Sequence, residues 1–588
     1  MASATIPLLK GLEAVDQVHA AINSASEESA REYRAPRMTE YAFPLLLGVL
    51  VVLLGTLPYL YSAAQATPDQ RFMGLVGRGV NGACGYFMFA RQARESHDLL
   101  ENRFTAEPLP RSYFSAEWWL FGHMARWLGR PLLWVFQLWR VLSVLAFACA
   151  VYFLAGACLG TVYQRRLAVS LIVLGSGLGW LLWLANEGGG LGLTISRDLK
   201  GVCVPGYLIN KPHFIRAGVF AALKYGCLVL GERTGRRRWF VLSGLAAVAE
   251  TAVRPFHIPE TYIVYLALPV LLNLRDGQWN GRRFANYLLA AAVHLPMVGV
   301  YLCFAHGNPL GMTGWDLASG FFLPGWGRPG FLLEMVFWLG WPFLLCCAGM
   351  PWLLRLRGVS KPQVFLVLWL LTAWLICNLY PYWGAGQEAG FHPFHLAPVL
   401  IVVGGFLPAL EARLHARGRR VSGPRRTAAA VALVLLSMPT TAIVYADMFH
   451  APQTDDMHAS HYLDRDTCAA LEWLDTNGRE GDIVLASYPT SQFIPWITGL
   501  KTVTGHYMFT IDRNAKNRAV QQFFATAYRE DLHGALLNTQ RVRFVVYGEN
   551  ERRLGTALPH GGWPGMAPVH RVGSTTVYRV ARADGAGG

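Results

Sequence analysis

The sequence lacks the short motifs that mark soluble catalytic and nucleotide-binding domains. No HExxH string is present, and none of the ten cysteines forms a CxxC pair. No GxGxxG or GxxxxGK(S/T) string follows any expected strand near the C-terminus. Charged residues are also scarce, at 15% of the chain. These absences argue against a zincin-type protease, a CxxC centre and a nucleotide-binding fold in the C-terminal part.

The chain instead has a series of long apolar runs. Eleven can be counted, and most approach the length of about 20 residues that a helix needs to cross a bilayer. The fifth, sixth and tenth runs are shorter, so we expect them to tilt or to lie inside the bundle. The fold class is therefore predicted to be a polytopic α-helical membrane protein with about eleven transmembrane helices. The runs are residues 43–63, 131–160, 167–185, 214–230, 239–253, 258–274, 284–305, 331–354, 363–381, 395–410 and 427–446.

Arginine and lysine are unevenly distributed over the short loops between these runs. One alternate set is rich in them, with six arginines between 413 and 426, whereas the other set has few. Because positively charged loops stay in the cytoplasm, this pattern places residues 1–40 inside. An odd number of spans over 41–447 then places residues 448–588 outside. The loop 64–130 is rich in arginine although this pattern places it outside. It is long, and the rule applies mainly to short loops.

These features predict an integral protein of the cytoplasmic membrane. The net charge of +15 is explained by loops that face anionic lipid, so no nucleic-acid partner is expected. The first 37 residues show no cleavable signal peptide. Apolar residues recur there at helical spacing, which fits a loose tail or a docking helix. Cys84 and Cys203 fall in two different outer loops, and the sequence leaves open whether they form a disulfide.

Two outer loops are large, at 64–130 and 186–213, and the tail forms a third outer part. The first loop ends in an aromatic stripe over 114–128, which predicts an interfacial helix or, alternatively, the start of the second span. The tail is expected to form a soluble α/β unit around a small parallel or mixed sheet. Its helices are predicted at 467–476, 518–528 and 530–537, and its strands at 482–487, 542–547 and 575–580.

Ionisable groups within or at the ends of spans are costly, so each is a candidate for function. Glu250 and Arg254 have the spacing of a helical ion pair, and His257 and Glu260 follow within two turns. Two interpretations remain open for this group. It is either a structural pair in a proline-broken helix or a phosphate site built on Arg254.

A second group of candidates lies in and beyond the loop 186–213. Basic residues mixed with one carboxylate suit a phosphorylated lipid head, although they equally suit a solvated loop. His213 and Arg216 favour the functional interpretation because a span begins there. The members of the group are Arg197, Asp198, Lys211, His213 and Arg216.

A third group precedes the tenth span in a loop without Lys or Arg. Glu388, His392 and His395 could supply metal ligands, but Pro393 breaks the helical spacing that would align them. Polar anchoring of Gln387 and its neighbours at the interface is the favoured interpretation. We therefore expect no metal and no other cofactor.

The first outer loop contains two candidates for a general base. Asp69 and Asp98 are its only aspartates, and either could accept a proton if it faces a cavity. A lone loop carboxylate is otherwise solvated. No Ser–His–Asp arrangement can be inferred from the sequence.

Several short sequence patterns occur in a fixed order over residues 40–580, and a known family has similar patterns in the same order. On these patterns the chain resembles the GT-C superfamily of membrane glycosyltransferases, particularly bacterial multi-pass members with an extracytoplasmic α/β tail. The patterns are YFMFARQ (Tyr86–Gln92), LLENRFTAEP (Leu99–Pro108), GSGLGW (Gly175–Trp180), Asp198, Pro212–Phe214, Arg254–His257, ALEWL (Ala470–Leu474) and DIVLA (Asp482–Ala486).

The resemblance implies transfer of a sugar from a polyprenyl-phosphate carrier to an acceptor at the outer membrane face, with inversion. The partners are then the lipid-linked sugar and membrane lipid. Asp69 or Asp98 would be the base, and Asp198 would position the substrate. The expected substrate-binding residues are His213, Arg216, Arg254, His257, Glu260, Gln387, Glu388 and His392.

The chain also departs from the family pattern. Relatives commonly have acidic residues four or five positions before the tyrosine matching Tyr86, where this chain has Gly82 and Asn81. Gln387 and Glu388 stand where relatives often have arginines. The alternative is therefore an inactive GT-C-like scaffold subunit of a membrane complex. A transporter is disfavoured because no repeated half-structure is seen.

Overall fold

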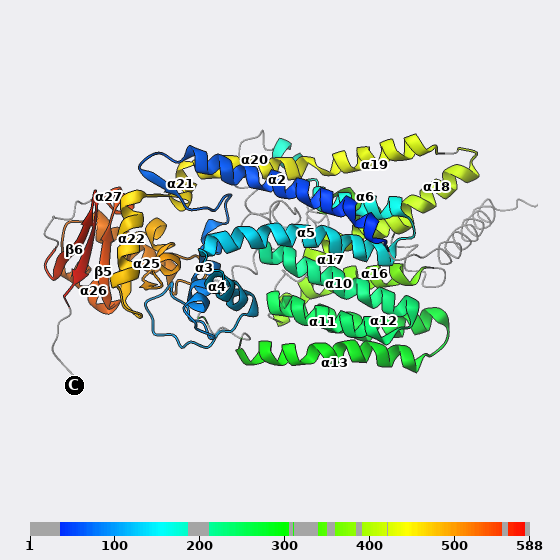
Figure 1. The fold of residues 1–588 in the computed structure, drawn as a ribbon, viewed down its shortest axis with the longest axis horizontal. Coiled ribbons are helices and arrows are strands. Elements are labelled where there is room, and N and C mark those ends of the chain that lie inside the picture. The colour runs from blue at the N-terminus through cyan, green and yellow to red at the C-terminus, as the bar shows by residue number, and fades with distance from the viewer. Residues whose placement is uncertain are drawn as a thin grey trace, which may run out of the picture.

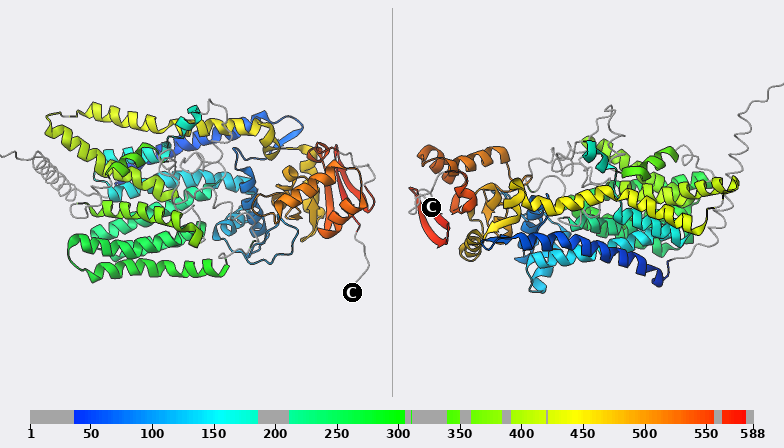
Figure 2. Two further views of the ribbon diagram at one scale, coloured as in Figure 1. Left: turned by 180° about the vertical axis from the view of Figure 1, so that it is seen from behind. Right: turned by 90° about the horizontal axis from the view of Figure 1, so that it is seen from above.

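The computed structural model describes residues 36–185, 211–304, 310, 339–349, 359–383, 391–419, 421–555 and 563–581. Long helices run side by side along the longest axis, and a small sheet lies at one end of them (Figure 1). The view from behind and the view from above show the same arrangement (Figure 2). Helices α3 and α4 lie between the long helices and the sheet.

By length and composition, six helices of the described chain are suited to crossing a membrane, or seven if a pair bent by 43° counts as one span. All eleven runs expected from the sequence overlap a described helix, but the rest are shorter or interrupted. The long helices are α2 (Ala42–Gln65), α5 (Leu132–Cys158), α10 (Pro212–Thr234), α12 (Ile258–Asp276), α13 (Gly281–Phe304) and α17 (Phe391–Ile401) continuing into α18 (Leu407–Ala416); the bent pair is α19 (Gly423–Ser437) and α20 (Pro439–His450).

Helix α10 is the most enclosed of the long helices. In the apolar 18-residue stretch of α10, 83% is buried inside the protein. The corresponding share for α13, at the edge of the bundle, is 22%. It packs against α5 and against α11 (Arg237–Val253). His213 and Lys224 on α10 therefore lie inside the protein. The remaining bundle helices are α6 (Val162–Leu174), α7 (Gly179–Ala185), residues 339–349 and α16 (Lys361–Trp383).

The segment over residues 66–131, here called the α3–α4 segment, caps one end of the bundle. It contains β1 (Gln70–Phe72), α3 (Val80–Arg94) and α4 (Ala116–Trp127). Helix α4 confirms a helix within 114–128. It is separate from α5, because the chain turns at Gly129 with φ +61° and α5 begins after Pro131. A Cβ atom on Gly122 would lie 2.3 Å from the carbonyl oxygen of Ala90, so α4 crosses α3 at close range.

The C-terminal residues 455–581, here called the tail unit, contain a five-stranded sheet of order β4-β3-β5-β7-β6. β3 pairs in parallel with β4 and β5, whereas β7 pairs antiparallel with β5 and β6, so the predicted mixed sheet is confirmed. The short β4 and the edge strand β6 were not predicted from the sequence. The strands are β3 (Ile483–Leu485), β4 (Lys501–Thr502), β5 (Val542–Tyr547), β6 (Met566–Val572) and β7 (Thr575–Val580); the main helices are α22 (Arg465–Asn477), α25 (Arg513–Ala525) and α26 (Ala535–Thr539).

The tail unit and the α3–α4 segment share one hydrophobic core. Phe87 of α3 stacks on Trp496 with ring centroids 4.4 Å apart, and Leu75 lies in the same buried cluster as Leu471 and Val484. In addition, β1 pairs antiparallel with β2 (Tyr462–Asp464). This shared core fixes the tail unit over the end of the bundle.

Candidate functional site at the capped end of the bundle

His213 and Arg254 meet at the start of α10. The His213 ring lies edge-on to Tyr86 of α3 and Trp118 of α4, at centroid distances of 4.5 and 5.1 Å. The Arg254 guanidinium carbon lies 3.7 Å from the centre of the Phe214 ring, a cation–π contact, and the His213 ring contacts the same phenylalanine. Both side chains are buried, at 5% and 2% exposure. The structure thus brings together two residues that the sequence singled out separately.

Arg216, one turn further along α10, forms an ion pair with Glu117 of α4. The Trp139 indole donates a hydrogen bond to the same carboxylate at 3.2 Å, and its ring lies 4.4 Å from the guanidinium carbon. Glu117 is buried, so it is a carboxylate of the first loop that faces the bundle. Glu117 is not among the candidates predicted from the sequence, which in this loop are Asp69 and Asp98.

Glu260, at the start of α12, is a hub of buried hydrogen bonds. Its Oε1 accepts hydrogen bonds from the Tyr225 hydroxyl at 2.7 Å and from the Trp369 indole at 2.6 Å. Its Oε2 lies 3.1 Å from Nδ1 of His257. A charge-assisted network of this kind holds η4 (Pro255–His257) and α12 against α10 and α16.

Lys224 is a buried cation in the middle of α10. Its Nζ lies 2.5 Å from Oε2 of Glu250 and donates a hydrogen bond to the Thr261 hydroxyl at 2.8 Å. The expected Glu250–Arg254 spacing is present as a backbone hydrogen bond of 2.7 Å. Lys224 lies within a predicted span, where an ionisable residue is a functional signal, but sequence reasoning did not single it out.

His392, at the start of α17, reaches α10 and η4. Its Nε2 lies 2.9 Å from the carbonyl oxygen of Phe214, and its ring stacks on His257 at a centroid distance of 4.9 Å. Glu250, His257 and His392 each offer one ligand atom, and these three atoms lie within 4.8 Å of one another. The metal ligands considered from the sequence were Glu388, His392 and His395, so only His392 is common to both groups.

The carboxylates proposed as general bases lie on the α3–α4 segment. Asp69 is exposed, and its carbonyl oxygen accepts a hydrogen bond from the Arg465 amide. Asp98 is also exposed, and its Oδ1 accepts a hydrogen bond of 2.8 Å from the Trp119 indole. Asp198, Gln387 and Glu388 lie outside the described residues.

The fold of this chain is similar to that of known proteins of solved structure. A scan of protein-family models and a search of curated proteins each found no match. Among solved structures, the oligosaccharyltransferase of Archaeoglobus fulgidus tethered with an acceptor peptide matches at 14% identity and a TM-score of 0.50, over 86% of this chain and 69% of that chain. The arabinofuranosyltransferase AftD from Mycobacteria matches at 14% identity and a TM-score of 0.50, over 94% of this chain and 40% of that chain.

The chain has the GT-C fold. At these identities the likeness is one of fold alone and assigns no chemistry to the residues of this chain. Within the fold, the α3–α4 segment covers the ends of the helices that carry His213 and Arg254.

Position 81 of this GT-C fold carries Asn81 rather than an acid. Its amide nitrogen donates a hydrogen bond of 2.8 Å to the carbonyl oxygen of Gly505, and its amide oxygen accepts one of 3.1 Å from the Tyr507 amide. The neighbouring Gly85 also packs tightly, because a Cβ there would lie 2.6 Å from the Phe509 ring. This turn of α3 therefore docks the tail unit.

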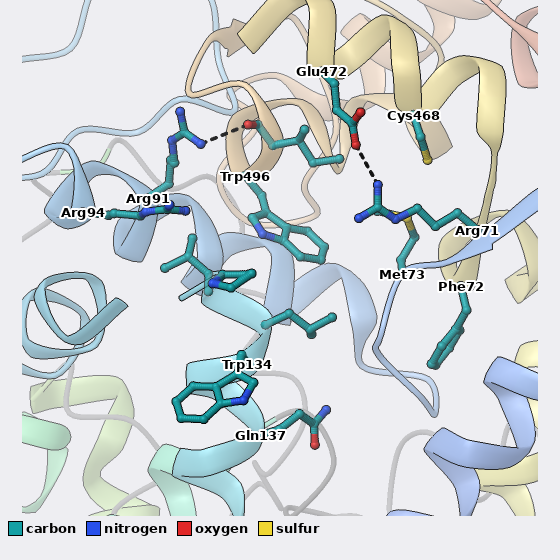
Figure 3. Close-up of a pocket in the computed structure, with 14 residues that line it drawn as sticks. Arg71, Phe72, Met73, Arg91, Arg94, Trp134, Gln137, Cys468, Glu472 and Trp496 are labelled. Carbon is teal, nitrogen blue, oxygen red and sulfur yellow. Dashed lines mark hydrogen bonds and ion pairs between the residues drawn. The ribbon is translucent and has the colours of Figure 1, made fainter. Parts of the chain in front are cut away.

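A pocket of about 600 Å³ opens in the GT-C fold where α3, the start of α5 and the tail unit meet. Figure 3 shows the Trp496 indole projecting into it, with Trp134 of α5 on the opposite side. The Arg71 guanidinium pairs with Glu472 at 2.8 Å, and the Arg91 guanidinium donates a hydrogen bond to the Ile497 carbonyl at the other rim. The volume lies in the range of small-molecule pockets.

Proposed function

We propose that the chain is a membrane glycosyltransferase that moves a sugar from a polyprenyl-phosphate carrier to an acceptor at the outer membrane face. In this proposal residues 1–40 are cytoplasmic, eleven helices span the membrane over 41–447, and residues 448–588 lie outside. The observation that carries the proposal is the meeting of Arg254 and His213 under the α3–α4 segment of a GT-C fold. Structural neighbours of this fold are named as glycosyl- and oligosaccharyltransferases.

The chemistry requires cations where the phosphate leaves. When the bond between the sugar and the carrier phosphate breaks, negative charge develops on the phosphate oxygens, and fixed cations stabilise that charge. Arg254 supplies a permanently charged guanidinium, and His213 supplies a ring nitrogen next to it. The pair is buried, where such interactions are stronger than in water. Arg216 is engaged by Glu117, so in this proposal it mainly positions α4.

The acceptor hydroxyl requires a base. Asp98 is supported by its fixed position, because the Trp119 indole holds one carboxylate oxygen while the residue stays exposed to solvent. Asp69 is the alternative, and Asp198 would position the substrate. His257, Glu260 and His392 would bind the carrier head beside Arg254, together with Gln387 and Glu388.

The proposal is tested with purified protein and a panel of polyprenyl-phosphate sugars. Release of the polyprenyl phosphate is measured for the native chain and for the variants Asp69→Asn, Asp98→Asn and Arg254→Gln. Hydrogen bonds to charged groups contribute about 1.5–3 kcal/mol, so Arg254→Gln should lower kcat/KM by roughly 10- to 100-fold. The matched control is Arg237→Gln, which changes an exposed arginine at the other end of α11 and should leave turnover unchanged.

A second candidate function is an inactive scaffold subunit of a membrane complex. It is favoured by Asn81, whose amide is used to hold the tail unit where relatives commonly carry acids. The scaffold predicts no turnover with any donor and tight copurification of other membrane subunits. Turnover that is abolished by one of the aspartate variants would exclude it.

A further inference from the structure

Glu250, His257 and His392 converge from three elements that are separate in sequence. Glu250 lies near the end of α11, His257 in η4 and His392 at the start of α17. One ligand atom from each lies within 4.8 Å of the others. Among the residues that the structure describes, this is the one group of three such side chains.

Each of the three residues has one polar atom engaged and one buried atom without a hydrogen-bond partner among the described residues. Glu250 uses Oε2 for Lys224, His257 uses Nδ1 for Glu260, and His392 uses Nε2 for the Phe214 carbonyl. The atoms without a hydrogen bond are Glu250 Oε1, His257 Nε2 and His392 Nδ1. Glu250 Oε1 also lies 3.9 Å from Nδ1 of His257. Buried polar atoms that stay unpaired are costly, so such a coincidence requires an explanation.

The engaged atoms also fix the tautomers of the two rings. Nδ1 of His257 faces a carboxylate and Nε2 of His392 faces a carbonyl oxygen, so each of these nitrogens carries the proton and donates. In the neutral rings the opposite nitrogens then hold a lone pair. This is the arrangement found around metal-bound histidines, whose second nitrogen donates to a carboxylate or a backbone carbonyl.

We propose that Glu250, His257 and His392 bind one divalent transition-metal ion of the zinc class. Two imidazole nitrogens and one carboxylate oxygen are a ligand set that zinc uses when a fourth position stays open. A tetrahedral site with bonds of about 2.0 Å places ligand atoms about 3.3 Å apart, so ligand atoms that lie within 4.8 Å of one another have to move closer together on binding.

The surroundings hold these ligands in place. Lys224 restrains the Glu250 carboxylate, and Glu260 restrains His257. Gly218 lets the His392 ring approach α10, because a Cβ there would lie 3.1 Å from its Nε2. Each proposed ligand therefore has a hydrogen bond or ion pair to a residue outside the group, as metal ligands commonly do.

The test measures the metal content of the purified full-length chain after treatment with a chelator and reconstitution with Zn²⁺. The native chain should hold about one zinc ion. The variants Glu250→Gln, His257→Gln and His392→Gln should each lose most of it. The control is His395→Gln, because His395 also lies on α17 and has a buried ring nitrogen without a hydrogen-bond partner but lies outside the group.

A second measurement is needed because a ligand variant could lose its metal simply by failing to fold. His392→Cys keeps a ligand at the same position, so with Co²⁺ it should retain about one ion and gain a thiolate-to-cobalt absorption band that the native chain lacks. The native chain with less than about one ion per five copies would overturn the proposal. So would full metal content in the three ligand variants, or bound Co²⁺ without the new band. The readout is metal content, so this result is separate from the presence or absence of sugar transfer.

Discussion

At the scale of single residues, the pair of Arg216 and Glu117 links the bundle to the α3–α4 segment. Both side chains are largely buried, and Trp139 adds a hydrogen bond and a ring contact to the pair. Taking two charges out of water is costly, but leaving only one of them behind costs more. The pair therefore ties α4 to α10 beside His213.

We predict that Arg216→Met destabilises the protein by about 3–5 kcal/mol, because it leaves the Glu117 carboxylate buried without its cation. The apparent melting temperature of the detergent-solubilised protein measures the effect. The double variant Arg216→Met with Glu117→Gln should recover much of the loss. Equal melting temperatures for the native chain and Arg216→Met would show that the pair is not held in solution.

At the scale of elements, the crossing of α3 and α4 depends on a small residue. Gly122 leaves no room for a Cβ, because backbone atoms of α3 lie within 2.7 Å of where it would stand. We predict that Gly122→Ala forces α4 away from α3, at a cost of about 1–3 kcal/mol that is typical of overpacking. The melting temperature measures stability, and protease sensitivity over residues 95–130 measures the displacement.

A matched control for this substitution is Gly299→Ala. Gly299 lies inside α13, and a Cβ added there would have no neighbouring atom within 4 Å, so the same change meets open space. Alanine has the higher helix propensity, by about 1 kcal/mol, and this variant should be neutral or slightly stabilised. A similar loss in both variants would contradict the packing argument.

At the scale of the whole molecule, charged groups hold the tail unit on the α3–α4 segment. Burial by itself raises the pKa of Glu101, but hydrogen bonds and charge from Arg111 and Lys501, with the charge of Arg103, outweigh it and lower the pKa. The hydrogen bond from Arg111 likewise lowers the pKa of Glu480 in the tail unit. Both carboxylates are thus stabilised in their charged form by the docked arrangement.

Docking of the tail unit should therefore be sensitive to acid. A carboxylate whose pKa is lowered by folding stabilises the folded state above its unfolded pKa of about 4.3, and this contribution is lost as the pH falls through the folded pKa. We predict that the amides of β1 and β2 lose protection against hydrogen exchange, relative to an unfolded chain at the same pH, as the pH falls below about 4.3. In Glu101→Gln the exchange should be faster at neutral pH and should change less with acid. An equally steep acid response in that variant would contradict the assignment.

Orientation in the membrane is also testable on the whole chain. Arg479→Cys places a thiol on the exposed surface of the tail unit, and Arg419→Cys places one in the exposed loop after α18. With the tail outside, a membrane-impermeant maleimide should label the first variant in intact cells and the second only after permeabilisation. The unmodified chain gives the background of its natural cysteines. The reverse pattern would invert the proposed topology.

Local pattern was sufficient for much of the architecture. The apolar runs predicted helices, the stripe over 114–128 predicted α4, and the apolar strands β3, β5 and β7 were identified in the tail. These features could be predicted because burial in lipid or in a core is recorded in the spacing of neighbouring residues. The two-residue β4 and the partly exposed edge strand β6, which contains Pro568, carried no such signal and were missed.

By itself, the sequence determined that this is a helical membrane bundle with an α/β tail, because hydrophobicity and its period act over a few turns of chain. Only the tertiary structure decided which polar residues meet. Glu117 pairs with Arg216 although about a hundred residues separate them in the sequence. Glu250 and His257 lie close to His392 although the separation is larger. Which residues come close together depends on how the helices cross and pack. The number of residues between two positions in the sequence does not determine the distance between them in the fold.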